Sequence, residues 1–411
     1  MTRASRHHGP RPLEGTIVLD FSRVLSGPHA TRILTDLGAD VIKVEPPTGD
    51  LTRFTNPRIN SLSTYFIQQN TGKRNISVDL DKPAARELMA RLSEKVDVLV
   101  ENFSSEVMAK MGLDYPSLAR NNPRLVYVSI TGFGADGPWS KRKAYAPVIN
   151  AETGLTKSQG DARGGDYSND PHSHGDVYTG MYAAIGALAA LHQRQLTGHG
   201  QFVDVSMAES MLYANEHAHD ALWDREPPVG VTRSFRPGDY PVLTAANGEV
   251  AVATGHPAEN GTFDFFVAAM EAPHLAKDPR FVDQASRLAN LEVLQKLIRD
   301  WAATCANFSE LSEKLASNRI PIGRLQSTSD LAGSDWSKSR RATIDVADRG
   351  DGWIHLPNSP WHFSDSDTSV AGIPRYRGED NREVLTQLLG LSSDEIDSYE
   401  REGVILSRGP R

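Results

Sequence analysis

The stretch GTIVLDFSRVLSGPHATRILTDLGADVIKVEPP, residues 15–47, decides the fold. It begins with a β-rich run at 15–22 and continues with a helical pattern at 28–39 that ends near Gly38. A second β-rich run follows at 40–47, where two prolines terminate it. A strand, a helix and a strand in this order predict a βαβ unit whose two strands lie parallel in one sheet.

The same alternation continues through the first half of the chain. An amphipathic helix is predicted over 82–95, where Pro83 suits the first turn, and strands are predicted over 96–103, 125–134 and 201–207. We therefore expect an α/β fold with a Rossmann-like parallel sheet in a large domain. Neither GxGxxG after the first strand nor GxxxxGK[ST] occurs, so the pattern disfavours a nicotinamide-dependent oxidoreductase.

The composition of the later segments predicts a second, smaller domain inserted into the large one. Residues 1–223 form the first part of the large domain, and 224–241, rich in Pro, Gly and Arg, reads as a linker. An α+β unit is predicted over 242–322, where an Asn-Gly pair indicates a hairpin turn. A second linker over 323–350 leads to residues 351–411, which return to the large domain.

Charge and cysteine content exclude several classes of protein. The 411 residues carry a net charge of −8 with scattered Lys and Arg, so nucleic acid and anionic membranes are not expected as partners. Cys305 is the only cysteine and reads as a buried, inert thiol, which fits a reducing cytosol. The longest run of low charge, 177–191, is too short to span a bilayer. We expect a cytoplasmic protein.

The segment HSHGDVYTG, residues 172–180, offers three interpretations of Asp176. It precedes a helical run, so it suits a helix N-cap, which is the commonest role for such a residue. It could bind a metal together with His172 and His174, but this spacing without further ligands is a weak signal, and no metal is predicted. It could also be a carboxylate nucleophile, held as an anion by the helix terminus.

Several blocks, in this order along the chain, resemble class III CoA-transferases of the formyl-CoA transferase and carnitine CoA-transferase type. They are PLEGTIVLDFSRVLSGPHATRILTDLGADVIKVEPPTGDLTR (12–53), QQNTGKRNISVDL (68–80), VDVLVENFSSEVMAKMGLDY (96–115) and GDVYTGMYAAIGALAAL (175–191). The α-methylacyl-CoA racemases are a divergent branch of the same family. The resemblance implies a two-domain fold, an interlocked homodimer and no cofactor besides the coenzyme A thioester substrate.

The resemblance also implies a mechanism centred on Asp176. Its carboxylate attacks the acyl-CoA thioester to give an acyl–aspartyl anhydride, and the released CoA thiolate then forms an aspartyl–CoA thioester. A carboxylic acid reverses these steps and leaves as its CoA ester. The two residues of the sequence implied to lie beside Asp176 are Lys143 and Tyr145.

Family correspondence further implies which residues bind coenzyme A. An Asn, an aromatic residue and a cation of the site match residues of ENFSSEVMAKMG, and the pair in NTGKRN supplies the next candidates for a phosphate. These residues are Asn102, Phe103, Lys110, Met111, Lys73 and Arg74. Lysine at 110 supplies charge but not the bidentate fork of the arginine found in formyl-CoA transferases. The alternative for each cation is a solvated surface charge, and Phe103 could belong to the core.

Position 145 bears on the choice between transferase and racemase. Racemases usually present a histidine followed by an acidic residue there, whereas this chain has Tyr145 followed by Ala146. Without that base a two-base racemisation is difficult, which favours a transferase. An acyl-CoA racemase or epimerase, or a non-catalytic homologue that binds coenzyme A, remain the alternatives.

Three departures from the formyl-CoA transferase pattern point away from formate and oxalate as substrates. The region 231–248 lacks a glycine run, Leu25 stands in place of glutamine, and Ala146 stands in place of an acidic residue. A larger acid is the expectation, with its pocket shaped by a loop over 155–174.

Overall fold

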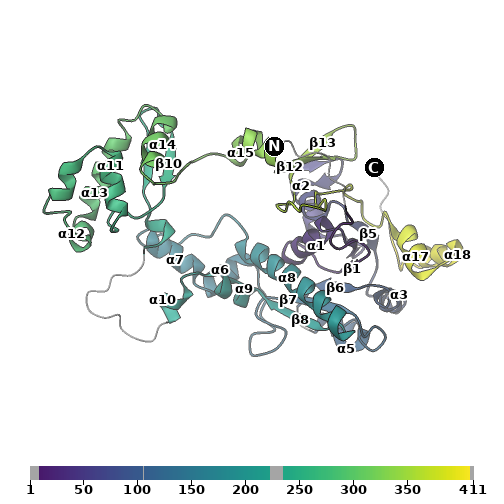
Figure 1. Cartoon of the computed structure of the whole chain (residues 1–411). Coiled ribbons are helices and arrows are strands. Elements are labelled where there is room, and N and C mark those ends of the chain that lie inside the picture. Colours follow the sequence, from purple (N-terminus) through teal and green to yellow (C-terminus); the bar gives the residue numbers. More distant parts are fainter. Residues whose placement is uncertain (1–8, 105, 223–234, 408–411) are drawn as a thin grey trace. The chain divides into compact units, whose positions relative to one another are not determined.

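The computed structural model describes residues 9–104, 106–222 and 235–407. The chain divides into two compact units, residues 1–223 together with 337–411, and residues 224–336 (Figure 1). Among the described residues, no helix combines the length and the apolar character needed to cross a membrane.

A six-stranded parallel sheet is the framework of the first unit. Its strand order is β5-β2-β1-β6-β7-β8, and every neighbouring pair runs parallel. The chain therefore builds the sheet outward from β1 in one direction and then, from β6, in the other. The strands are β1 (Ile17–Asp20), β2 (Asp40–Glu45), β5 (Arg74–Ser77), β6 (Val98–Glu101), β7 (Val126–Thr131) and β8 (Phe202–Ser206).

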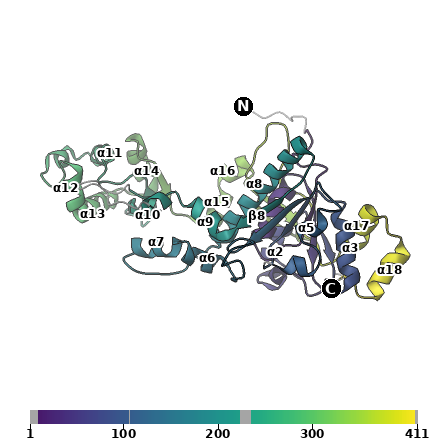
Figure 2. The same ribbon diagram turned by 90° about the horizontal axis from the view of Figure 1, so that it is seen from below.

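Helices cover both faces of this sheet (Figure 2). On one face, alternate strand residues such as Val18 and Val128 pack against α1 (Ser26–Asp36) and α8 (His174–Thr197). On the other, Leu19 and Leu99 pack against α3 (Pro83–Ser93), α17 (Asn381–Leu389) and α18 (Ser393–Arg401). Burial on both faces explains why the central strands β1, β6 and β7 are mostly apolar. The predicted α/β, Rossmann-like fold is confirmed.

The other elements of the first unit surround this framework. A separate apolar cluster joins α2 to the hairpin β12–β13 through residues such as Phe66 and Leu356. The bounds are η1 (Leu51–Phe54), β3 (Arg58–Ile59), β4 (Leu62–Ser63), α2 (Thr64–Asn70), α4 (Val107–Lys110), α5 (Tyr115–Leu118), α6 (Ala146–Glu152), α7 (Leu155–Ala162), α9 (Met207–Ala214), α10 (Ala218–Leu222), β12 (Thr343–Ala347) and β13 (Trp353–Pro357).

The second unit has its own apolar core. Phe263, Leu294 and Leu311 come from three of its helices and are buried together with Cys305, as expected for an inert thiol. Its antiparallel sheet has the order β11-β10-β9, and Gly248 in the predicted hairpin turn has a φ of 86°. The bounds are η2 (Pro237–Asp239), β9 (Val242–Thr244), β10 (Val250–Ala253), α11 (Thr262–Ala269), η3 (Pro273–Lys277), α12 (Gln284–Ala289), α13 (Leu291–Ala302), α14 (Phe308–Ser317), β11 (Ile322–Arg324) and α15 (Thr328–Gly333).

Several segments differ from the sequence predictions. The predicted linker over 323–350 contains α15, α16 (Asp335–Arg340) and all of β12. Ser327 forms the capping box that starts α15. The predicted loop over 155–174 contains α7. In the first predicted linker, residues 224–234 lie outside the described part of the chain.

Candidate active site

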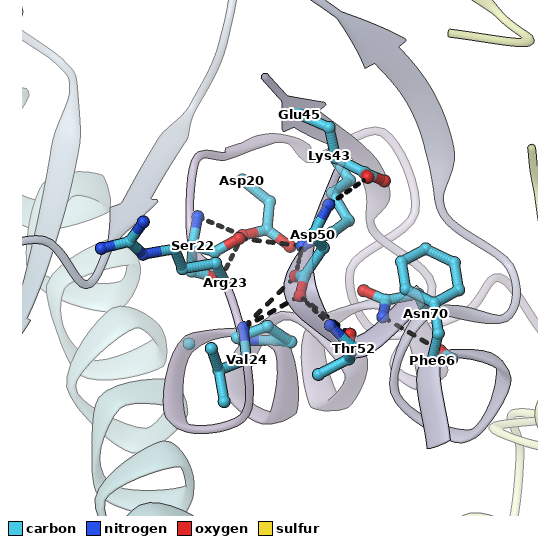
Figure 3. Close-up of polar contacts among 12 residues, drawn as sticks. Asp20, Ser22, Arg23, Val24, Lys43, Glu45, Asp50, Thr52, Phe66 and Asn70 are labelled. Carbon is cyan, nitrogen blue, oxygen red and sulfur yellow. Dashed lines mark hydrogen bonds and ion pairs between the residues drawn. The ribbon is translucent and has the colours of Figure 1, made fainter. Parts of the chain in front are cut away.

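A buried polar network fixes the loop between β1 and α1 (Figure 3). Asp20, the last residue of β1, accepts hydrogen bonds from the backbone N–H of Ser22 at 2.9 Å and from the hydroxyl of Thr31 at 2.6 Å. The ammonium of Lys43 donates to the carbonyl oxygen of Ser22 at 2.8 Å and pairs with Asp50 at 3.1 Å. Charges buried this completely hold a loop in one arrangement, because a movement would leave one of them unpaired.

Val24 in this loop has an unusual backbone. Its φ is 67°, a left-handed conformation that costs a residue other than glycine about 1–3 kcal/mol. Its N–H donates to the Asp50 carboxylate, with N–O distances of 3.2 and 3.4 Å. The surrounding network therefore maintains a turn that valine would not adopt by itself.

Asp176 lies in the first turn of α8, but it is not the N-cap. The cap position belongs to Ser173, whose carbonyl oxygen accepts the backbone N–H groups of Asp176 and Val177 at 3.1 Å each. The helix thus begins before the aspartate and places its carboxylate in the third helical position, where the positive end of the helix dipole still favours an anion. The helix ends at Gly198, whose φ of 80° is the left-handed conformation that glycine adopts readily.

Two opposing influences act on the ionisation of Asp176. Burial raises the pKa of the carboxyl to about 6. Hydrogen bonds from the backbone N–H groups of Ser26 and Ala146 and from the Ser26 hydroxyl act in the opposite direction. The carboxylate is therefore only partly solvated and yet is mostly ionised at neutral pH, which suits a nucleophile.

Gly180 explains how close the two helices α1 and α8 come. A Cβ atom at this position would lie 2.6 Å from the carbonyl oxygen of Ser26 and 3.1 Å from the His29 side chain. Small residues at helical spacing, among them Ala183 and Ala187, are buried in the same apolar cluster as residues of α1. This close approach brings the start of α1 to Asp176.

A cavity of about 220 Å³ opens beside Asp176. It lies where β1, β6 and β7 end, and the strand order reverses between β1 and β6. Ligands of open α/β sheets bind at such a reversal, at the carboxyl ends of the strands. The predicted site residues that line it together with Asp176 are Asn102, Phe103, Lys143 and Tyr145.

Lys110 and Met111 are not among the residues that line this cavity. Lys110 is an exposed residue at the end of α4 and lies 3.6 Å from the Glu106 carboxylate. Met111 is partly buried and packs against the core on the α3 side of the sheet. The structure therefore separates these two residues from the predicted group around Asn102.

Lys73 and Arg74 also lie away from the cavity. The Lys73 ammonium is buried and has four internal partners, among them Asp20 at 3.2 Å and Thr31 at 2.7 Å. Arg74 pairs with Asp40 and donates to Gln387 at 2.8 Å. The prediction that Lys73 contacts a phosphate does not fit this geometry, because its donors are already used inside the protein.

Sequence reasoning missed three residues of the site, Arg23, Ser26 and Arg142, which all line the cavity. The Arg23 guanidinium lies 5.3 Å from the centre of the Phe103 ring, whereas Arg142 pairs with Glu152. Arg23 and Ser26 could have been predicted from the sequence, because they come shortly after the first strand. Residues that follow parallel strands gather at the edge of the sheet where ligands bind.

The histidines near Asp176 form a different contact. His174 Nδ1 lies 2.5 Å from an oxygen of Asp170, and the His174 ring stacks on Tyr178. Within residues 9–104, 106–222 and 235–407, no group of three or more His, Cys, Asp or Glu side chains is placed to hold a metal ion.

Comparisons with known proteins agree on one family. The family model described as CoA-transferase family III matches residues 13–381. A succinyl-CoA:mesaconate CoA-transferase from Haloarcula hispanica is 34% identical over 94% of this chain and 99% of its own length. A formyl-CoA:oxalate CoA-transferase from Streptomyces avermitilis is 33% identical over 96% and 100%.

Solved structures include close neighbours of this fold. A CAIB/BAIF family protein from Brucella suis is 31% identical, with a TM-score of 0.78 over 92% of this chain and 100% of that chain. Both the sequence and the fold therefore match over almost the entire chain.

Proposed function

Since this chain belongs to CoA-transferase family III, we propose that it moves coenzyme A from an acyl-CoA thioester to a carboxylic acid with Asp176 as the covalent carrier. The observation that carries this proposal is the half-buried carboxylate of Asp176, which lines the cavity and is met by the N–H groups of Ser26 and Ala146. A nucleophile needs both an open approach and donors for the charge that develops beside it.

The reaction proceeds through two kinds of covalent intermediate. The Asp176 carboxylate adds to the thioester carbonyl, the C–S bond breaks, and CoA leaves as a thiolate from an acyl–aspartyl anhydride. The thiolate then attacks the aspartyl carbonyl and releases the donor acid, which leaves an aspartyl–CoA thioester. The acceptor carboxylate attacks this thioester and expels the thiolate, which finally attacks the acceptor's acyl carbon and frees Asp176.

The backbone donors have a defined task in these steps. Each attack on the aspartyl carbonyl creates a negative charge on its oxygen, and that oxygen is one of the two carboxylate oxygens of Asp176. The N–H groups of Ser26 and Ala146 face this carboxylate, so they stabilise the oxyanion without moving. One such donor contributes on the order of 10²–10³-fold to the rate in other enzymes.

The cavity lining supports an anionic substrate. Phe103 and Tyr145 offer apolar surface for the chain of coenzyme A, and Arg23 and Lys143 supply positive charge next to Asp176. The names of the two relatives give succinyl-CoA with mesaconate as the first donor and acceptor pair to test, and formyl-CoA with oxalate as the pair that Leu25 and Ala146 disfavour. Succinate and mesaconate are dicarboxylic acids, and a second carboxylate suits a cavity with these cations.

We also propose a homodimer. Apolar side chains are exposed along α8 and α9, with Met181 37%, Ile185 59% and Tyr213 82% exposed. An exposed group of large apolar residues on neighbouring helices is typical of a surface that another protein covers. A second copy of the chain is the partner that the family resemblance implies.

Covalent labelling tests the central proposal. The protein is incubated with succinyl-CoA or formyl-CoA, treated with hydroxylamine, and digested for mass spectrometry. We expect a hydroxamate on Asp176 in the wild type and none in Asp176→Ala. Asp161→Ala is the matched control, because Asp161 is an exposed aspartate on α7 that pairs with Lys157.

Two results would contradict the proposal. If every donor leaves Asp176 unlabelled although acyl-CoA binds, the chain is a non-catalytic homologue. If deuterium from the solvent enters the α-position of the acyl group without exchange of the acid, it is a racemase or epimerase.

A further inference from the structure

The side chain of Asn102 connects two parts of the active site. Asn102 directly follows β6, and its Oδ1 accepts the backbone N–H of Arg23 at 2.8 Å. Its Nδ2 donates to the carbonyl oxygen of Arg23 at 2.8 Å and to Ser26 Oγ at 3.2 Å. Because Arg23 presents one donor and one acceptor, its backbone sets which end of the amide is oxygen. The nitrogen end must therefore face Ser26.

This arrangement determines the direction of the Ser26 hydroxyl. A hydroxyl that accepts from Asn102 keeps its own proton free for another acceptor. Asp176 lines the same cavity, and its carboxylate can only accept when it is ionised. A hydrogen bond from the Ser26 side chain is among the influences that lower the pKa of Asp176, so this carboxylate is the acceptor in reach of the free proton. The close contact of α1 with α8 holds Ser26 next to the helix that carries Asp176, since a Cβ at Gly180 would lie only 2.6 Å from the Ser26 carbonyl oxygen.

We propose that Ser26 is a catalytic residue, whose hydroxyl donates a hydrogen bond to the aspartyl oxygen of Asp176 during each attack on the aspartyl carbonyl. The inference rests on the function proposed above. When the thiolate or carboxylate adds to the aspartyl carbon, the π electrons of the carbonyl move to its oxygen. The Ser26 proton stays on Ser26 and stabilises this oxyanion together with the N–H groups of Ser26 and Ala146.

Asn102 has the role of a positioning residue in this scheme. The two amide protons of Asn102 are donated to Arg23 and Ser26, and its oxygen already accepts from the Arg23 N–H. Only the second lone pair of this oxygen is left for a substrate. A residue that only binds coenzyme A would change KM when it is replaced, whereas a residue that orients Ser26 changes kcat. The two roles are therefore separable by kinetics.

The proposal is tested by steady-state kinetics of Ser26→Ala, Asn102→Asp, the double variant and a control. The substrates are succinyl-CoA and mesaconate, or the pair that the wild type uses best. Ser26→Ala removes the hydroxyl, and we expect kcat to fall roughly 10- to 100-fold with KM for acyl-CoA within about 2-fold. Asn102→Asp keeps the acceptor for the Arg23 N–H but turns the Ser26 proton toward itself, and we expect a similar loss. Because both act on one hydrogen bond, the double variant should lose no more than about the larger single loss.

Ser93→Ala is the matched control. Ser93 is a buried serine of α3 whose hydroxyl donates to the Met89 carbonyl oxygen at 2.8 Å, and this variant should keep the wild-type kcat. The proposal is overturned if Ser26→Ala keeps its kcat, if Asn102→Asp changes only KM, or if the two losses multiply. Hydroxylamine labelling separates these outcomes from a failure of the proposed function, because Ser26→Ala should still be labelled at Asp176.

Discussion

Asp176 combines a raised pKa with the task of a nucleophile, which makes the reaction sensitive to pH. Burial raises its pKa to about 6, and only the ionised form attacks a thioester. We expect kcat/KM for acyl-CoA to rise with pH, to reach half its plateau near pH 6 and to stay constant above pH 7. Initial rates between pH 5 and 8 measure this profile, and equal rates at both ends would contradict it.

The same raised pKa reduces the stability of the folded protein. Below the ordinary aspartate pKa the group is protonated in both states, so it has no effect on unfolding. As the pH rises from about 4 to about 6, the carboxyl of Asp176 loses its proton in the unfolded chain but keeps it in the folded protein. The free energy of unfolding therefore falls by about 1–2 kcal/mol, after allowance for the partial exposure of the group. We expect Asp176→Asn to unfold at a higher temperature than the wild type at pH 8 but not at pH 4, as measured by calorimetry. A gain of equal size at both values would contradict the raised pKa.

At the scale of elements, the contact between α1 and α8 sets the geometry of the site. Gly180→Ala places a methyl group against the Ser26 carbonyl, and overpacking of this kind costs about 1–3 kcal/mol. The helix must move away, which separates Asp176 from the donors at the start of α1. We expect at least a tenfold loss of kcat and a lower melting temperature, although alanine is the better helix former.

A second glycine of α8 is the matched control for this substitution. A Cβ at Gly186 would lie 2.9 Å from a methyl group of Val203, which can move aside. Gly186→Ala should therefore keep most of the activity and stability. Equal kcat values for the two variants would show that the close approach of the helices has no part in the reaction.

At the scale of the whole molecule, the exposed apolar surface of α8 and α9 predicts assembly. We expect sedimentation velocity at micromolar concentration to show a dimer for the wild type. Ile185→Glu places a charge in this surface and should produce monomers or weaken the dimer markedly. Lys157→Glu on α7, an exposed position that pairs with Asp161, serves as the control for the added charge. A stable wild-type monomer would contradict the proposed homodimer.

Much of the architecture could be predicted from the sequence, because strands and helices alternate with clear apolar periodicity from residue 15 onward. The site was predictable only in part. Asp176, Lys143, Tyr145, Asn102 and Phe103 do line one cavity. For Lys73 the sequence motif does not tell which way a side chain turns, and here it turns inward to Asp20.

The first residues of α1 also show what a local sequence pattern cannot predict. Ser26 belongs to the site because β1 and β6 are neighbours and because Gly180 admits the helix so closely. Both are contacts between segments far apart in the chain, and local patterns do not contain them. The N-cap prediction for Asp176 failed for a related reason, since the helix begins at His174 and Asp176 faces the cavity instead.

Because the charges under the Arg23 loop are buried and those of the cavity are exposed, we expect KM and kcat to respond differently to ionic strength. Salt screens exposed charges over about 10 Å at 0.1 M and about 3 Å at 1 M, but it screens buried pairs much less. Lys43 and Asp50 are almost fully buried, whereas Arg23 and Lys143 face solvent. Added salt should therefore raise KM for the anionic acyl-CoA several-fold, because salt anions screen the attraction of Arg23 and Lys143 for the substrate. It should leave kcat nearly unchanged, because the buried pairs that fix the loop are screened much less.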